Sequence, residues 1–168
     1  AQDRVRTALK NNGIALPPKR ITVNLAPADI RKEGAGFDLP LAAAVLAAAG
    51  VLSAEQLGNV MMAGEIGLNG EIHAISGILP MIIRAREEKC RFCVVPYDNL
   101  KEAHLIPDMK VIGVADLQEM IRYVSAPDSY KKAVETGKKS PQENSVDFCE
   151  LPQSHCGLTV VNQQQRFR

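Results

Sequence analysis

Residues 32–42 read KEGAGFDLPLA, a glycine-containing turn that leads directly into an apolar helix. A turn of this kind can bind a phosphate, present a nucleophile, or let the backbone turn before a buried helix. A phosphate-binding loop needs Gly-x-x-x-x-Gly-Lys-Ser/Thr, and this stretch lacks both the spacing and the lysine. A nucleophile here would be Ser, Thr or Cys, and residues 32–42 contain none of them. The structural interpretation remains: the glycines allow close backbone approach, Asp38 caps the helix, and Pro40 occupies an early position that tolerates proline.

Hydrophobic periodicity outward from this stretch predicts alternating helices and strands. Strands are indicated by a two-residue period and helices by apolar residues three or four apart. The predicted helices cover residues 3–12, 39–49, 80–89, 100–103 and 117–123, the last of them capped by Asp116. The predicted strands cover residues 20–25, 92–95 and 111–114. This alternation predicts an α/β or α+β fold.

A hairpin is predicted near the middle of the chain. The apolar run 60–63 is followed by Asn69-Gly70, a dipeptide favoured in tight turns, and then by the alternating run 71–75. We expect the two runs to pair with each other. Ser76 precedes the next helix and is predicted to cap it rather than to act as a nucleophile.

Length and composition predict one domain followed by a tail. Of the 168 residues, 46% are hydrophobic, which is enough for a sizeable core. The predicted domain covers residues 1–126, and residues 127–168 have the composition of a linker and disordered tail. The longest apolar stretch, 39–52, is shorter than the roughly 20 residues that span a bilayer, so no membrane contact is expected. No secretory signal opens the chain, which predicts a cytoplasmic protein, and the first residue is not Met, which suggests that the extreme N-terminus of the domain is missing.

The charge balance gives little reason to expect a strong, nonspecific grip on DNA. Residues 1–126 carry 14 Lys and Arg against 14 Asp and Glu. A local patch of Lys19, Arg20, Arg31 and Lys32 flanks the strand predicted at 20–25 and could contact phosphate. The alternative for this patch is an ordinary solvated surface.

The cysteines, histidines and paired acids predict no metal or catalytic cluster. Cys90 and Cys93 form a Cys-x-x-Cys pair, but a zinc site would need a second pair or closely spaced histidines. A redox Cys-x-x-Cys usually opens a helix, whereas this one runs into a predicted strand, so structural cysteines are favoured. The remaining candidates are predicted to be turn, strand-edge or surface residues: Glu65, Glu71, His73 and His104. Two further cysteines, Cys149 and Cys156, lie in the tail.

Two long segments carry a family resemblance. Residues 20–50 read RITVNLAPADIRKEGAGFDLPLAAAVLAAAG, and residues 63–87 read AGEIGLNGEIHAISGILPMIIRARE. Together they resemble the N-terminal domain of the ComM (YifB) family, bacterial AAA+ ATPases often labelled magnesium chelatase-like (ChlI-type), over about residues 3–125. The resemblance implies the ribosomal protein S5 domain 2-like α/β fold, which is also that of the Lon protease domain and of the C-terminal domain of RadA.

The resemblance to Lon also identifies where a catalytic dyad would lie. Lon-type proteases use a serine before the apolar helix and a lysine in the helix after the hairpin. The serine position falls on Gly36, and the lysine region reads Leu79-Pro80-Met81. Glycine has no side chain to attack a carbonyl, and neither Leu79 nor Met81 can accept a proton. No protease activity, catalytic residue, metal or cofactor is therefore expected in this chain.

The chemistry that the resemblance implies belongs to another module. ComM proteins have an AAA+ module that binds ATP and Mg²⁺ and drives DNA branch migration as a hexameric helicase in natural transformation. The present 168 residues contain no P-loop motif. Asp147-Phe148 resembles the junction to that module, but the residues after it do not resemble the family. Truncation, a degenerate gene and a frameshift all explain this.

Two functions are compatible with these patterns. The first is a non-catalytic accessory domain of a ComM-like ATPase, which supports homo-oligomeric ring assembly or contacts DNA or a partner. The second is a Lon-like peptidase with a different nucleophile, such as Ser53 or Ser76. Nothing in the residues supports insertion of magnesium into a porphyrin.

Overall fold

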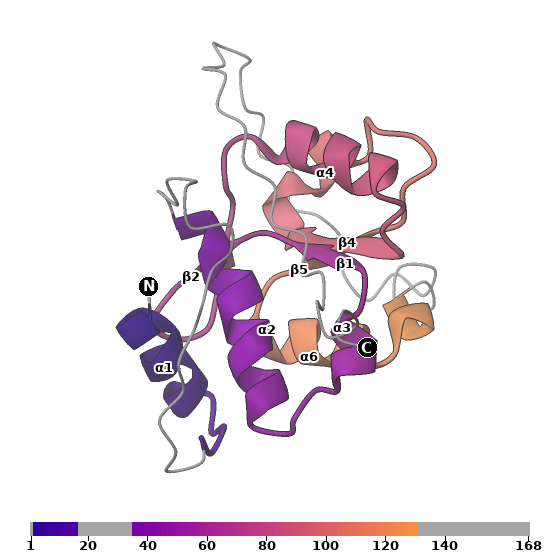
Figure 1. The fold of residues 1–168 in the computed structure, drawn as a ribbon. Coiled ribbons are helices and arrows are strands. Elements are labelled where there is room, and N and C mark those ends of the chain that lie inside the picture. The colour runs from indigo at the N-terminus through magenta and orange to yellow at the C-terminus, as the bar shows by residue number, and fades with distance from the viewer. Residues whose placement is uncertain (1, 17–34, 131–168) are drawn as a thin grey trace, which may run out of the picture.

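The computed structural model describes residues 2–16 and 35–130 (Figure 1). Several sequence predictions lie outside these residues. They are the strand at 20–25, the basic patch of Lys19, Arg20, Arg31 and Lys32, and the tail beyond residue 130 with Cys149 and Cys156. No helix in the described ranges has both the length and the apolarity needed to cross a bilayer.

A parallel three-stranded sheet forms the centre of the described structure. The strands β1 (Val60–Met62), β4 (Phe92–Pro96) and β5 (Val111–Val114) lie in the order β1-β4-β5. Met61 pairs with Cys93, and Cys93 pairs with Val111 on the other side. All residues of these strands except Gly113 and Pro96 are large or branched side chains or a cysteine, and every position is buried. Strands covered on both faces are expected to be continuous apolar runs, which explains their sequences.

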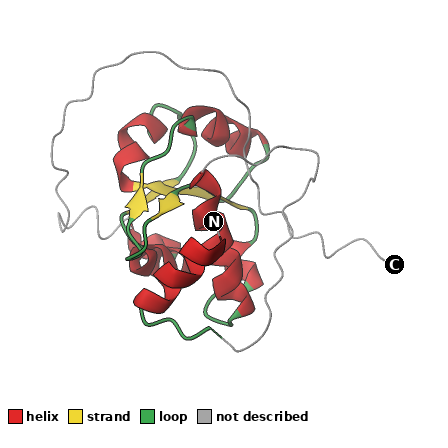
Figure 2. Ribbon diagram, turned by 90° about the vertical axis from the view of Figure 1, so that its left-hand side faces the viewer, coloured by secondary structure: helices red, strands yellow, loops and turns green. Residues whose placement is uncertain are grey.

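Helices cover both faces of this sheet (Figure 2). One face packs on α4 (Ile78–Glu87) and α5 (Leu100–Ala103) through Met61, Cys93 and Val95. The other face packs through Val60, Phe92 and Ile112 on a second set of helices. That set consists of α1 (Gln2–Asn11), α2 (Asp38–Ala48), α3 (Ala54–Leu57) and α6 (Leu117–Ser125). The predicted mixed α/β class is confirmed at this level.

The predicted hairpin exists, but its first strand was assigned wrongly. The run 60–63 contributes β1 to the parallel sheet, and the hairpin consists of β2 (Glu65–Ile66) and β3 (Ile72–His73). Its turn is closed by a 2.9 Å hydrogen bond from the Gly67 amide to the Glu71 carbonyl. Gly70 in this turn has φ +92°, which favours glycine. The run 60–63 is apolar at every position, which suits a strand buried on both faces better than a half-exposed hairpin.

The helix ends confirm some predicted signals and contradict one. Helix α1 ends before Gly13, which has φ +72°, and the Asp116 carboxylate caps α6 by accepting a 2.8 Å hydrogen bond from the Glu119 amide. Ser76 does not cap α4. The residue at that position is Gly77, with φ +77° and no side chain to accept a bond. A left-handed backbone at this point explains why glycine occupies it.

Gly64 lies where the chain leaving β1 meets the start of α2. Its amide donates a 3.0 Å hydrogen bond to the Gly36 carbonyl, and its own carbonyl accepts a 3.0 Å bond from the Leu39 amide. A Cβ at Gly64 would lie 3.1 Å from Ile72 Cγ2 and 3.3 Å from Leu39 Cδ2. The two backbones can therefore bond in both directions only because this residue has no side chain.

We predict that Gly64→Ala destabilises the protein and that Gly36→Ala does not. Overpacking of a buried site costs about 1–3 kcal/mol, so the free energy of unfolding should fall by that amount in Gly64→Ala. At Gly36 a Cβ would make an ordinary 3.4 Å contact with Ile75 Cδ1, so the change should stay within about 1 kcal/mol. Urea unfolding of both variants measures the difference. Equal losses in the two variants would contradict the close approach at Gly64.

Candidate functional site

The candidate site lies at the start of α2, beside the carboxyl end of β1. A short 3-10 helix, η1 (Ala35–Phe37), leads into α2 and carries Gly36, the position that the resemblance to Lon-type proteases aligns with their serine. In open α/β sheets, ligands bind beyond the carboxyl ends of the strands. The position of Gly36 is therefore that of a functional site, and the question is what its surroundings can do.

The space next to Gly36 is occupied by an apolar side chain. A Cβ built on Gly36 would lie 3.4 Å from Ile75 Cδ1 and 3.9 Å from Ile75 Cγ2. Ile75 follows β3 and packs against the core between the sheet and α4. A methyl group offers neither charge nor hydrogen bonds to a substrate. The surroundings of Gly36 on this side are therefore apolar.

Asn99 holds Ile75 in this place, and sequence reasoning missed it. The Asn99 side chain accepts a 3.0 Å hydrogen bond from the Ile75 amide and donates a 3.0 Å bond to the Ile75 carbonyl. It is only 6% exposed, so both bonds are shielded from water. A single side chain thus pairs with this backbone as a neighbouring strand would. Its position soon after the predicted strand 92–95 was the only local sign of this role.

The other half of a dyad is also apolar here. Leu79 and Met81 lie in the first turn of α4, both half-buried, and Met81 packs against the same core as Ile75. An amide that could stabilise an oxyanion at the start of α2 is likewise used, because the Leu39 N–H donates to the Gly64 carbonyl. The surroundings of both predicted dyad positions are therefore apolar or already hydrogen-bonded.

Asp38 does not cap α2, and this prediction was wrong. The residue at the cap position is Phe37, and Asp38 is the first residue of the helix, fully buried. Its Oδ2 accepts a 3.3 Å hydrogen bond from the Ile66 amide of β2 and lies 2.8 Å from Arg4 Nη2. The carboxylate points toward the hairpin, where the Arg4 guanidinium and the Ile66 amide replace the water molecules that it loses on burial. Its negative charge still interacts favourably with the dipole of α2, because Asp38 lies in the first turn of that helix.

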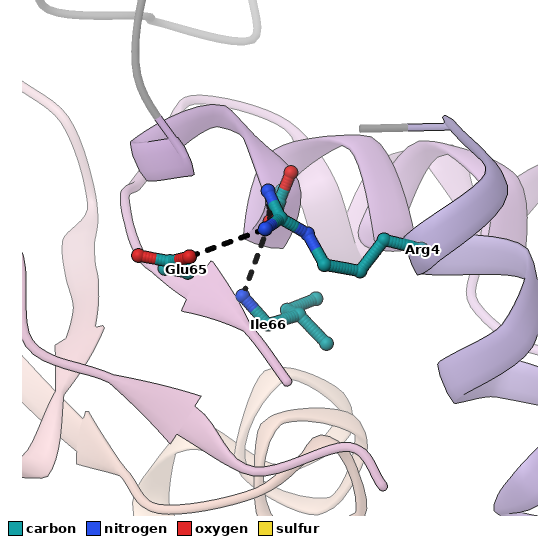
Figure 3. Close-up of polar contacts among 4 residues, drawn as sticks. Arg4, Glu65 and Ile66 are labelled. Carbon is teal, nitrogen blue, oxygen red and sulfur yellow. Dashed lines mark hydrogen bonds and ion pairs between the residues drawn. The ribbon is translucent and has the colours of Figure 1, made fainter. Parts of the chain in front are cut away.

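Arg4 joins three elements at this point. Figure 3 shows its guanidinium reaching from α1 toward Glu65 of β2, and Arg4 Nη1 lies 3.2 Å from Glu65 Oε1. Burial raises the pKa of Asp38, while the Ile66 amide and Arg4 act in the opposite direction. Asp38 Oδ1 and Arg4 Nε are buried without a hydrogen-bond partner among the described residues. The pair therefore positions α1, α2 and β2 at a considerable desolvation cost.

The remaining acids and histidines behave as predicted. His73 and His104 are exposed, and Glu71 Oε1 accepts a 3.3 Å hydrogen bond from Asn69 Nδ2 in the turn. Glu65, at the edge of the hairpin, is the partner of Arg4. Within residues 2–16 and 35–130, no three His, Cys, Asp or Glu side chains are grouped to hold a metal ion.

Within residues 2–16 and 35–130, the cysteines Cys90 and Cys93 and the two candidate serines show no activated nucleophile. Cys90 and Cys93 are buried, and burial, with a smaller effect of Cys90, raises the pKa of Cys93 to about 12. Its thiol is thus protonated at neutral pH and unreactive. Ser53 Oγ caps α3 by accepting from the Gln56 amide. Ser76 is exposed ahead of α4 and has no hydrogen bond to a base in the described part of the chain.

Comparisons with known proteins show the family to which the chain belongs. Residues 1–99 match the family model described as subunit ChlI of Mg-chelatase. The chain is 39% identical over 155 residues to Competence protein ComM of Haemophilus influenzae, which covers 90% of this chain and 30% of that protein. It is 33% identical over 163 residues to YifB of Escherichia coli, covering 96% of this chain and 32% of that protein. Lon protease 2 of Bacillus subtilis is 29% identical over 121 residues, which is 71% of this chain and 21% of that protein. The chain thus spans about a third of the length of its ComM and YifB relatives.

We predict that Arg4 and Asp38 are strongly coupled. Arg4→Met alone should lower the free energy of unfolding by about 2 kcal/mol, less than for a fully buried pair because Arg4 is about one-third exposed. Asp38→Asn, which keeps an acceptor for the Ile66 amide, should cost about 1 kcal/mol. The double variant should lie within about 1 kcal/mol of the parent, because no buried charge is left unpaired.

Chemical denaturation of the four proteins gives this double-mutant cycle. Losses that simply add in the double variant would show that the two side chains act independently. That result would contradict the role assigned to the pair.

Proposed function

The chain belongs to the family described as subunit ChlI of Mg-chelatase, and we propose that residues 1–126 form a non-catalytic accessory domain of a ComM-like AAA+ ATPase. The observation that carries this proposal is the contact between Gly36 and Ile75, which places a methyl group against the position that the resemblance aligns with the protease serine. The bonds from Asn99 to Ile75 support it, because they make that closure part of the folded core. The scaffold is kept and the reactive groups are gone.

We assign the finer fold within the same proposal. The similarity to Lon protease 2 and the helix-covered parallel sheet support the ribosomal protein S5 domain 2-like fold. The tight packing of the hairpin against α1 and α2 fits a domain whose role is mechanical. Such contacts hold the helices and the hairpin in fixed positions and do not themselves take part in a reaction.

In this proposal the ATP-dependent work belongs to a separate AAA+ module. That module would bind ATP and Mg²⁺, assemble as a hexamer and drive branch migration of DNA in the cytoplasm. The accessory domain would support ring assembly, and its balanced charge argues against a strong DNA grip of its own. Lys19, Arg20, Arg31 and Lys32 remain candidates for a weaker phosphate contact.

A peptidase is the second candidate, because the chain is similar to Lon protease 2 over 71% of its length. Of the two serines considered for it, Ser53 is engaged in a cap, whereas Ser76 is exposed. Ser76 is therefore the residue on which that candidate depends. It lies close along the chain to His73, and an imidazole is the usual base for a serine nucleophile.

Peptide hydrolysis separates the two candidates. We predict that the full chain cleaves casein or a fluorogenic peptide no faster than buffer, and that Ser76→Ala gives the same trace. Gly36→Ser serves as a matched variant: its side chain fits beside Ile75, but without a base it should also be inactive. Hydrolysis by the parent chain that disappears in Ser76→Ala would establish the peptidase and overturn the accessory role.

A further inference from the structure

Two side chains bond to the outer edge of β5 and the residue that follows it. In the described sheet β5 pairs with β4 alone, and just beyond β5 the Ala115 carbonyl accepts a 2.8 Å hydrogen bond from the Ile72 amide of β3. The Gly113 amide on that edge donates a 3.2 Å hydrogen bond to the Tyr130 hydroxyl. The next outward amide, of Ala115, donates a 2.9 Å bond to Glu119 Oε2. Unpaired strand edges attract other strands, so closure of this kind protects the fold.

Tyr130 comes from a short segment that follows α6. The backbone breaks from helical geometry at Ala126, where φ is −141°, and residues 127–130 are helical again. Ser129 donates from both its amide and its Oγ to the Ala126 carbonyl, at 3.0 and 2.6 Å. These bonds shape the segment internally. They do not by themselves hold it on the sheet.

The contacts between this segment and the domain are few and centred on Tyr130. Its ring packs edge-on against Tyr123, with centroids 5.1 Å apart and planes at 78°. Asp128 lies 3.4 Å from Lys110 Nζ, but its side chain is 97% exposed, and such pairs contribute little. The Tyr123 contact and the Gly113 hydrogen bond both attach the segment to the domain through Tyr130. Tyr130 is also half-buried against the core, which shields that hydrogen bond.

We propose that residues 127–130 form a latch, in which Tyr130 docks on β5 and holds the start of the following chain against the domain. Because the latch has one buried anchor, it can open while the core stays folded, as weakly packed segments do. Opening frees the chain beyond Ala126 and exposes the Gly113 amide at the strand edge. The latch is inferred from contacts within this chain, so it does not depend on the proposed function.

Hydrogen exchange of the full chain tests the latch directly. In Tyr130→Phe the ring stays and the acceptor is lost, so the Gly113 amide should exchange on the order of fivefold faster, the factor expected for one net hydrogen bond. Tyr123→Phe is the matched control, because it removes a hydroxyl from the same ring pair without touching Gly113. It should leave Gly113 exchange unchanged. The amides of Val94 and Ile112 in the central strands should be unaffected in both variants.

Limited trypsin digestion gives an independent measure, since Lys131 and Lys132 directly follow the latch. Cleavage that requires a local opening follows the population of the open form. Fragments ending at Lys131 or Lys132 should therefore appear several times faster from Tyr130→Phe than from the parent or from Tyr123→Phe. Unchanged Gly113 exchange in Tyr130→Phe would overturn the proposal. A rise shared equally by Val94 and Ile112 would also overturn it, because it would reflect global rather than local opening.

Discussion

The buried ion pair between Arg4 and Asp38 determines how the first helix, the apolar helix α2 and the hairpin fit together. Asp38 is fully buried and contacts Arg4 and the Ile66 amide, while Arg4 also reaches Glu65. A carboxylate in such a place is costly unless a cation lies against it. Its position is therefore tied to α1 on one side and to β2 on the other. The start of α2, and with it Gly36, lies where these contacts place it.

The same region is consistent with the proposed role of the domain as a scaffold without its own reactive groups. The bonds between Gly64 and the turn at Gly36, together with the short approach that a glycine at 64 allows, fix the backbone at the start of α2. Ile75, bound by Asn99, then fills the place next to Gly36. These are packing and backbone interactions, and they stabilise the domain whether or not a nucleophile is present. In the proposed accessory role, the serine and lysine positions can therefore change while the core stays intact.

Local patterns predicted most elements but few of the contacts at the site. The short strands 92–95 and 111–114, the end of α1 at Gly13 and the Asp116 cap follow from periodicity and turn chemistry, and the structure has them. The hairpin partner was wrong because a short apolar run does not reveal whether one or both faces are buried. The role of Asp38 depends on Arg4, far away along the chain, and only one signal pointed to it: a carboxylate in an otherwise apolar helix needs a buried partner. No comparable signal marked Asn99, whose importance comes from the backbone it meets.

The central claim is that an apolar side chain closes the site at Gly36. The most direct measurement is a NOESY spectrum of the methyl-labelled protein, which detects protons closer than a few ångströms. The account predicts a strong cross-peak between the Gly36 α-protons and the Ile75 δ-methyl, together with slow exchange of the Asn99 side-chain amide. An absent cross-peak, with both groups instead in contact with water, would show an open site and contradict the account.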